Sequence, residues 1–186
     1  MVNPSPNTIL ARLAAEREVA MQTHAMENLA IFEATSDCDF EEARGLFQEY
    51  ADSLGADLCF QNFEHELKNL RDIYGAPTGC LLLARSNDSI IGCVAFRRFD
   101  DAGCEMKRLY VKPAARGMNV GRRLTVEIIH RARSAGYRRM VLDTLPGLQA
   151  AQALYRSLGF RDIKPYYASP VESAIYMELD LLEKRD

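Results

Sequence analysis

The sequence predicts an α/β fold built on a mixed sheet, in which most strands are antiparallel and one central β-α-β unit is parallel. Three observations predict it. Helix-spaced and strand-like stretches follow one another in the order strand, two helices, three strands, helix, strand, helix, two strands. One strand–helix–strand unit, around residues 105–144, should form a right-handed parallel crossover. The 186 residues contain no internal repeat and no interdomain linker, and they suit one domain with a sizeable core.

The N-terminal stretch, residues 1–28, is predicted to be a weakly amphipathic helical extension. Ile9, Leu13 and Met26 recur at helical spacing, and no motif accompanies them. We expect this extension to pack on the main domain, to mediate a dimer or to stay mobile.

The first part of the main domain combines one strand with two helices. Apolar residues recur at helical spacing in two stretches, and acidic residues that can cap a helix precede the first. The expected elements are a strand over Leu29–Ala34, a helix from near Phe40 to Gly55 capped by Asp37 or Asp39, and a helix over Phe63–Tyr74.

Strand-like alternation then replaces helical spacing. Turns rich in Asn, Asp and Gly separate three such stretches, which predicts an antiparallel meander over Cys80–Arg85, Ile90–Phe99 and Glu105–Val111. Glycines punctuate the rest of the chain. They predict a helix from Gly121 to Gly136, a strand over Met140–Thr144, a helix over Ala150–Leu158 closed by Gly159, and strands over Phe160–Ile163 and Ile175–Leu179.

The composition argues against several functional classes. The net charge is −3, with 48% hydrophobic and 26% charged residues, so we expect no nucleic-acid partner. No run of 18 apolar residues and no signal-peptide pattern occurs, which predicts a cytoplasmic protein without a membrane partner. The three histidines have no ligand-like spacing, and we expect no metal. Buried free thiols are expected because the five cysteines form no Cys-x-x-Cys pair: Cys38, Cys59, Cys80, Cys93 and Cys104.

A short turn of arginine and glycine joins the last meander strand to the next helix. The chain runs Arg-Gly-Met-Asn-Val-Gly over residues 116–121, and Arg122 and Arg123 follow in the first helical turn, where cations oppose the helix dipole. Such a turn can aim several unpaired backbone N–H groups at one place, and arginines there suit a bound anion. The turn therefore predicts a phosphate or pyrophosphate site; the alternative is a surface loop with solvated arginines.

The turn lacks the Gly-Lys-Ser/Thr of a P-loop and the glycine spacing of a dinucleotide-binding fingerprint. It resembles motif A of the GNAT N-acetyltransferase superfamily, Gln/Arg-x-x-Gly-x-Gly/Ala, which cradles the pyrophosphate of acetyl-CoA. Asn119 replaces the usual glycine, a mild departure because asparagine tolerates positive φ better than other residues with a side chain. The matching residues are Arg116, Gly117, Met118, Asn119, Val120 and Gly121.

A second segment, Ala-Leu-Tyr-Arg-Ser-Leu-Gly-Phe over residues 153–160, resembles the Leu-Tyr-x-x-Leu-Gly-Phe that ends the fourth helix of that family. By itself it could be two core aromatics, Tyr155 and Phe160, around a glycine-capped helix end. The two segments occur in the family's order with a strand between them, and the order of elements is that of the GNAT fold. We therefore expect residues 29–182 to form a GNAT domain.

The resemblance implies an enzyme that moves an acetyl group from acetyl-CoA to a primary amine, of a small molecule rather than a protein, by direct attack in a ternary complex. Backbone amides from Met118 to Arg122, with Arg116 nearby, would hold the pyrophosphate. Leu109, Tyr110 and Val111 would pair with the pantetheine arm like an added strand, at an expected β-bulge. A backbone N–H near Val111 would polarise the thioester carbonyl.

The same resemblance implies two catalytic residues. Tyr155 matches the family's general acid, which protonates the departing thiolate. Glu105 stands where some members carry a glutamate base, which matters because an alkylamine is about 99.9% protonated at pH 7. The alternative for Glu105 is a strand residue that faces solvent or pairs with Lys107 or an arginine. Cys104 borders the expected site and could be a reactive thiol, but it lacks a histidine partner for an acyl-enzyme.

The acceptor site is expected where the early helices, the meander and the last loop meet. Candidate wall residues are Tyr50, Phe60, Phe63, Tyr166 and Tyr167, and Asp57, Glu64 and Glu66 could attract a cationic amine. The segment Lys164–Glu172 is expected either to close over the substrate or to be a plain hairpin connection. Two other functions stay open: a non-catalytic acyl-CoA-binding module, and an acetyltransferase for a protein amino group docked by residues 1–28.

Overall fold

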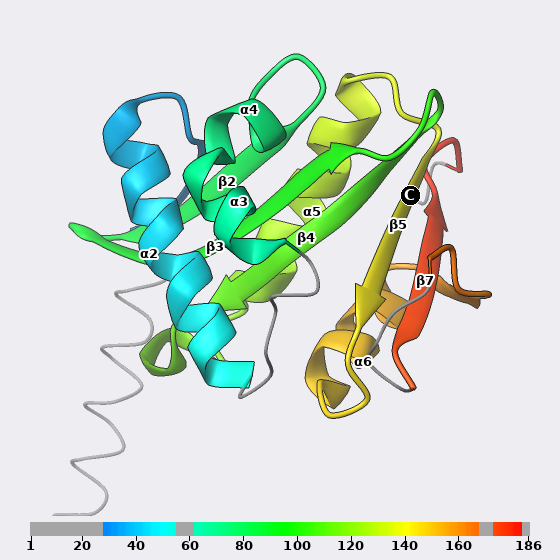
Figure 1. Cartoon of the computed structure of the whole chain (residues 1–186). Coiled ribbons are helices and arrows are strands. Elements are labelled where there is room, and N and C mark those ends of the chain that lie inside the picture. Colours follow the sequence, from blue (N-terminus) through cyan, green and yellow to red (C-terminus); the bar gives the residue numbers. More distant parts are fainter. Residues whose placement is uncertain (1–27, 55–61, 168–172, 184–186) are drawn as a thin grey trace, which may run out of the picture.

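The computed structural model describes residues 28–54, 62–167 and 173–183, and a seven-stranded sheet forms its centre (Figure 1). The strand order is β1-β2-β3-β4-β5-β7-β6, and every neighbouring pair is antiparallel except β4 and β5. Helix α5 (Val120–Ser134) joins these two parallel strands. The mixed sheet with one parallel crossover confirms the predicted fold class. The strands are β1 (Leu29–Glu33), β2 (Cys80–Ser86), β3 (Ser89–Arg98), β4 (Gly103–Val111), β5 (Arg139–Thr144), β6 (Arg161–Ile163) and β7 (Ile175–Asp180).

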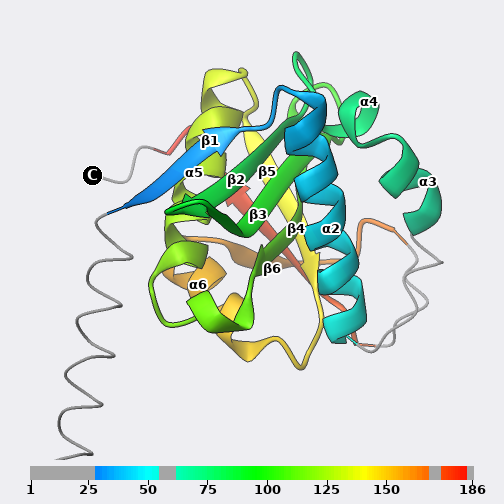
Figure 2. The same ribbon diagram turned by 90° about the vertical axis from the view of Figure 1, so that its left-hand side faces the viewer.

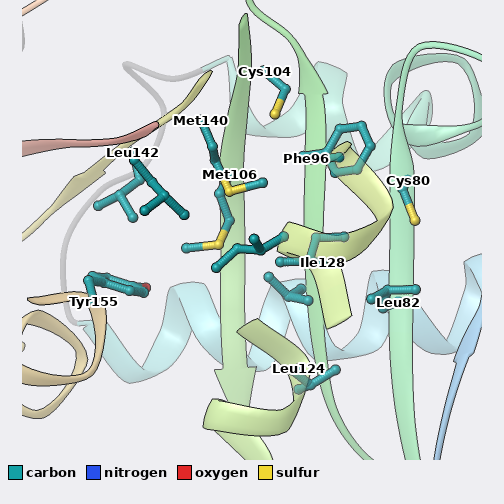
Figure 3. Packing of buried hydrophobic residues seen from close by; sticks show 14 of the residues in the cluster. Cys80, Leu82, Phe96, Cys104, Met106, Leu124, Ile128, Met140, Leu142 and Tyr155 are labelled. Carbon is teal, nitrogen blue, oxygen red and sulfur yellow. The ribbon is translucent and has the colours of Figure 1, made fainter. Parts of the chain in front are cut away.

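Helices cover both faces of the sheet. Helices α2 (Asp37–Leu54), α3 (Phe63–Lys68) and α4 (Leu70–Tyr74) lie on one face, and α5 and α6 (Gln149–Ser157) lie on the other (Figure 2). Successive strand residues point to opposite faces, and each face has its own apolar core. The core on the α2 face includes Phe47, Tyr74 and Leu81. The core on the α5 face includes Leu82 and Ile128 (Figure 3).

The elements expected over residues 29–182 are present, with bounds close to those predicted, but the helix expected over Phe63–Tyr74 is broken in two. Asn69 separates α3 from α4 with φ −126° and ψ 32°, and its side-chain amide donates to the carbonyl oxygen of His65 at 2.8 Å. A side chain that bonds to the nearby backbone in this way competes with continued helix. Periodicity alone could not show this break, since the apolar spacing continues across it.

The first long helix starts earlier than expected and is capped by a different residue. Neither Asp37 nor Asp39 is its cap. Ser36 Oγ accepts from the N–H of Asp39 at 3.2 Å, and the Asp39 carboxylate accepts from the N–H of Ser36 at 2.8 Å. This reciprocal pair is a capping box, with Asp in the place of Glu or Gln. The hydrogen bonds from the backbone of Ser36 and Thr35 also lower the pKa of Asp39.

The parallel pairing of β4 with β5 is short, and it leaves an opening between the two strands. Its register joins residues 103–105 to residues 139–141 and ends there. Beyond that point the two strands separate towards their C-terminal ends (Figure 1). The side of β4 that faces β5 therefore carries backbone groups that no neighbouring strand of the sheet pairs.

A β-bulge lies in β4 beside this opening, at Arg108 and at Leu109, the first residue of the stretch where a bulge was expected. Val94 of β3 lies opposite two residues of β4, Arg108 and Leu109, and Arg108 adopts a left-handed φ of 59°. The extra residue interrupts the alternation of side chains. As a result Lys107 and Arg108, although consecutive, both lie on the face that α2, α3 and α4 cover, where each pairs with a carboxylate.

The predicted N-terminal extension lies outside the described residues, apart from Asn28.

Candidate active site

A cavity of about 760 Å³ opens between β4 and β5 and reaches the turn before α5. Its volume falls within the usual range for ligand sites, roughly 300–1,000 Å³. Helices α2 and α6 complete its wall. Met118 does not line it, because its side chain packs against the core on the α5 face. The predicted residues that do line it are Leu109, Tyr110, Val111, Arg116, Gly117, Asn119, Val120, Gly121, Arg122 and Tyr155.

The turn before α5 presents free backbone donors to this cavity. Gly117 (φ +82°) and Asn119 (φ +59°) both adopt left-handed conformations there, so the asparagine accommodates the backbone as expected. The N–H of Arg123 donates to the carbonyl oxygen of Asn119 at 3.1 Å. The N–H groups of Val120 and Gly121, which precede it in the first turn, have no acceptor within the helix. Together with the helix dipole they suit an anion.

The three arginines of the turn divide into two groups. Arg116 and Arg122 line the cavity, and each is held by one hydrogen bond, to the carbonyl oxygen of Val111 at 3.2 Å and to Ser157 Oγ at 3.0 Å. Arg123 instead donates to the carbonyl oxygen of Leu29 in β1 at 3.1 Å. Arg116 and Arg122 are therefore the two arginines of the turn that line the cavity.

The end of α6 fixes the position of Tyr155. Gly159 adopts φ +99°, and its N–H donates to the carbonyl oxygen of Arg156 at 3.0 Å. The N–H of Phe160 donates to the carbonyl oxygen of Tyr155 at 3.1 Å, and the two rings lie 5.6 Å apart. These bonds and this apolar contact make a Schellman motif. The Leu-Gly-Phe sequence is therefore a helix stop that also braces the tyrosine.

The Tyr155 hydroxyl is buried but has no hydrogen-bond partner among the described residues. The residue is 6% exposed, lines the cavity, and points from α6 towards Leu142 and Met106 (Figure 3). Burial raises its pKa, and the neighbouring Tyr50 and Asp143 add to the rise. The hydroxyl thus keeps its proton at neutral pH and can donate it to a group that enters the cavity.

Glu105 lies behind the cavity wall and does not line it. Its carboxylate is 2.7 Å from Nη2 of Arg97 and 3.4 Å from Nζ of Lys107, and it accepts from the hydroxyl of Tyr166 at 3.0 Å. These partners match the pairing that was the alternative to a catalytic role. Glu105 reaches the cavity only through Lys107, which does line it.

Three charged residues of the cavity wall were not singled out from the sequence: Lys107, Arg108 and Asp143. The signal was present, since two consecutive basic residues interrupt a strand of apolar character and an aspartate interrupts the next one. Lys107 Nζ lies 2.9 Å from Asp143 Oδ1. Arg108 forms a two-pronged pair with Glu66, at 2.8 and 2.5 Å.

These residues belong to a group of six buried or half-buried charges on the α2 face, which we call the charged layer: Glu66, Arg97, Glu105, Lys107, Arg108 and Asp143. Each carboxylate of the layer accepts from at least one cation and from one tyrosine hydroxyl. The tyrosine donors are Tyr74 to Glu66 at 2.7 Å, Tyr166 to Glu105 at 3.0 Å, and Tyr167 to Asp143 at 3.0 Å. Three negative and three positive side chains leave the layer neutral.

The residues expected to form the acceptor site differ in whether they line the cavity. Tyr50 lines the cavity, and the ring of Phe63 packs 5.1 Å from the Arg108 guanidinium carbon. Glu64 is exposed, and Glu66 is already paired, so neither is a free carboxylate at the cavity. Tyr166 and Tyr167 belong to the charged layer's hydrogen bonds, whereas Asp57, Phe60 and most of the last loop after Tyr167 lie outside the described residues.

Cys104 is not the reactive thiol that its place in the sequence suggested. It is buried in the core on the α5 face and does not line the cavity, and burial raises the pKa of its thiol to about 12. A thiol that stays protonated is a poor nucleophile. Cys80 and Cys93 are likewise buried and free, as predicted, while Cys38 is exposed.

In the described part of the chain, no helix combines the length and the apolar character that crossing a membrane requires. Nor do three or more of its His, Cys, Asp and Glu side chains gather in an arrangement suited to a metal ion.

Comparison with known proteins bears on the whole of this site. Residues 39–160 match the family model described as "Acetyltransferase (GNAT) family", which spans more than half of the chain and both motifs. The chain belongs to the GNAT acetyltransferase family. A Schizosaccharomyces pombe protein named an uncharacterized N-acetyltransferase is 43% identical over 156 residues, covering 83% of this chain and 96% of that protein. This GNAT protein is therefore an N-acetyltransferase, as the two motifs predicted.

Solved structures show the same fold. An acetyltransferase from Streptococcus agalactiae matches with a TM-score of 0.70 at 20% identity, over 82% of this chain and 98% of its own. An acetyltransferase from Salmonella typhimurium, solved with its cofactor acetyl-CoA, matches with a TM-score of 0.60 at 22% identity, over 86% and 97% of the two chains.

Proposed function

We propose that this GNAT protein transfers an acetyl group from acetyl-CoA to the primary amine of a small molecule, by direct attack in a ternary complex. The observation that supports it most is the continuity of one cavity from the free N–H groups of α5, through the opening between β4 and β5, to the Tyr155 hydroxyl. A diphosphate, an extended arm and a reacting thioester need these three features in that order. The acetyl-CoA in the Salmonella typhimurium relative agrees with this donor.

The cofactor would lie along the opening. Its pyrophosphate would accept from the N–H groups of Val120 and Gly121, with Arg116 and Arg122 beside it. The pantetheine amides would pair with the free side of β4 over Leu109–Val111, as an added strand pairs with a sheet edge.

The reaction would then proceed between β4 and Tyr155. The amine nitrogen attacks the thioester carbonyl carbon and forms the C–N bond, and a backbone N–H near Val111 stabilises the resulting tetrahedral oxyanion. The C–S bond breaks as this oxyanion collapses to the amide. The leaving sulfur takes the proton of Tyr155, which water then restores. The amine gives up one proton, through Lys107 to Glu105, so that the products are a neutral amide and the free thiol of CoA.

Cofactor binding is tested at Gly121, where the chain offers a matched control. A Cβ there would meet only Val111 Cγ2 at 3.8 Å and Leu154 Cδ2 at 3.9 Å, so Gly121→Ala should fold and bind normally. Gly121→Glu adds a carboxylate beside the pyrophosphate, and like-charge repulsion should weaken acetyl-CoA binding at least ~30-fold. Calorimetric titration measures both. A wild-type protein that shows no heat of binding would contradict the proposal.

Glu105 enters the proposal as a base that acts through Lys107, which would take the amine's proton while passing its own to Glu105. Glu105→Gln should lower kcat about 100-fold near neutral pH, and the deficit should shrink at high pH as amines lose their own protons. Rates of thiol release across the pH range measure this. Glu178→Gln, which removes another arginine-paired carboxylate away from the cavity, is the control. A constant deficit at every pH would leave Glu105 a structural role only.

A further inference from the structure

The β4 bulge brings two cations to the acceptor end of the cavity. Asp143, the nearest partner of Lys107, lines the cavity too, but Glu66, the partner of Arg108, stays behind the wall. Lys107 and Arg108 line the cavity, but Glu105 and Glu66 do not. Without the bulge, alternation would send one of the two basic side chains to the other face of the sheet. A group that enters from the cavity can therefore reach the Arg108 guanidinium without meeting its partner Glu66.

Arg108 has hydrogen-bond donors to spare. A guanidinium carries five N–H groups, and Glu66 takes one from Nε and one from Nη2. The other terminal nitrogen, Nη1, has no acceptor among the described residues, although Arg108 is only 6% exposed. Buried donors are nearly always satisfied. The ring of Phe63, against the guanidinium, and the Glu66 fork hold its plane in place.

Negative charge at this end of the cavity is, by contrast, fully engaged. Asp143 is the one acidic residue among the described residues that line it, and its two oxygens accept from Lys107 Nζ at 2.9 Å and from the Tyr167 hydroxyl at 3.0 Å. An amine that arrives as a bare cation finds no free carboxylate in the described wall. An amine that carries its own carboxylate needs no carboxylate from the protein, because its two charges balance each other. Such a molecule has no net charge to be offset by the charged layer, which is itself neutral.

We infer that the acceptor carries a carboxylate beside its amine, as an α-amino acid does, and that Arg108 binds this carboxylate through Nη1. This inference rests on the proposed function, because it concerns the second substrate of the same site. The charge-assisted bond would anchor the acceptor on the α2 face. It would aim the amine across the opening towards the thioester, with Tyr50 beside the acceptor side chain.

The test compares acceptors that differ only in this carboxylate. Wild-type protein saturated with acetyl-CoA is given each of the twenty L-amino acids and the matching carboxamides, and thiol release is recorded. The acids should react with kcat/KM about 10- to 100-fold above their amides, as expected for a hydrogen bond to a charged group. The amine of a carboxamide is less basic and so more reactive at neutral pH, which means that a preference for acids reports binding.

Arg108→Lys identifies the residue responsible. Lysine keeps a positive charge for Glu66 but has no second terminal nitrogen, so the variant should lose most of the preference for acids through a higher KM. Its acetyl-CoA titration should match wild type, which also verifies folding. Arg97→Lys alters an arginine of the charged layer that does not line the cavity, and should keep the preference.

The outcomes separate this inference from the proposed function. Equal rates with acids and amides, or no turnover of any carboxylate-bearing amine, would overturn the inference even if acetyl-CoA binds. A preference for acids that survives in Arg108→Lys would overturn the role of Arg108. A wild-type protein that fails to bind acetyl-CoA would defeat the proposed function first, and the inference with it.

Discussion

Replacing Tyr155 with phenylalanine is expected to lower kcat about 100-fold or more, with acetyl-CoA binding and stability nearly unchanged. The hydroxyl has no partner in the described structure, so removing its oxygen breaks no hydrogen bond there. What is lost is the proton for the departing sulfur. Steady-state rates, calorimetry and urea unfolding measure the three quantities separately.

Tyr137→Phe is the matched control for this change. It also removes a buried tyrosine hydroxyl, which donates to the carbonyl oxygen of Thr78 at 2.7 Å, but from a ring that does not line the cavity. It should cost about 1 kcal/mol of stability and leave kcat unchanged. A Tyr155→Phe variant within twofold of the wild-type kcat would show that the sulfur leaves without help from this group.

The raised pKa of Tyr155 sets the pH dependence. Burial disfavours the phenolate, so the protonated form that acts as an acid persists above the ordinary pKa of 10. The wild-type rate should therefore rise with pH as the amine loses its proton, and should show no fall below pH 10 from loss of the acid. A fall in rate below pH 10 that vanishes in Tyr155→Phe would show that Tyr155 loses its proton in that range, and would contradict its raised pKa.

Replacing Glu66 with alanine is expected to lower the free energy of unfolding by about 3–5 kcal/mol, because it leaves the buried Arg108 charge unpaired. Tyr74 loses its acceptor as well. Urea unfolding measures the change. Glu64→Ala on the same helix is the control, since Glu64 is exposed and its loss should stay within about 0.5 kcal/mol. Equal urea midpoints for the two variants would refute the importance of the pair.

The same pair contributes to the dependence of stability on pH. Burial by itself would raise the pKa of Glu66, but the hydrogen bonds and charge of Arg108, with the Tyr74 hydroxyl, outweigh it and lower the pKa. A carboxyl whose pKa is depressed by folding stabilises the protein above its unfolded value, near 4.5, and loses that contribution as the pH falls through the folded value. In Glu66→Ala this part of the acid sensitivity should disappear.

Local signals in the sequence predicted most of the fold and the backbone geometry of the turn before α5, which lines one end of the cavity. The glycine after α6 and the phenylalanine beyond it mark a helix stop, and that stop is also what places Tyr155. The left-handed Asn119 and the free N–H groups after it follow from turn chemistry confined to a few residues. The residue types alone were sufficient to predict those features that depend only on neighbours in the sequence.

Features that depend on distant partners were not predictable in the same way. The bulge itself was expected, but which side chain it turns towards α3 depends on the register between β3 and β4, and one residue of slip changes which face a side chain occupies. Glu105 has the position of a base in sequence, but only the packed structure brings Arg97 and Tyr166 to it. The break at Asn69 likewise depends on a side-chain bond that apolar spacing does not reveal.

The early parting of β4 and β5 has a mechanical consequence. The sheet consists of a four-strand half and a three-strand half, and their direct backbone pairing is limited to residues 103–105 with 139–141. A cofactor bound in the opening would connect the two halves of the sheet. Its amides would form hydrogen bonds with the half that contains β4, and its other atoms would pack against the half that contains β5. By mass action, a ligand at 100 times its Kd adds about 2.7 kcal/mol to stability. The donor substrate would then hold the two halves of the sheet together while it is bound. After each release of CoA, the only backbone pairing between the described strands of the two halves would again be that of residues 103–105 with 139–141.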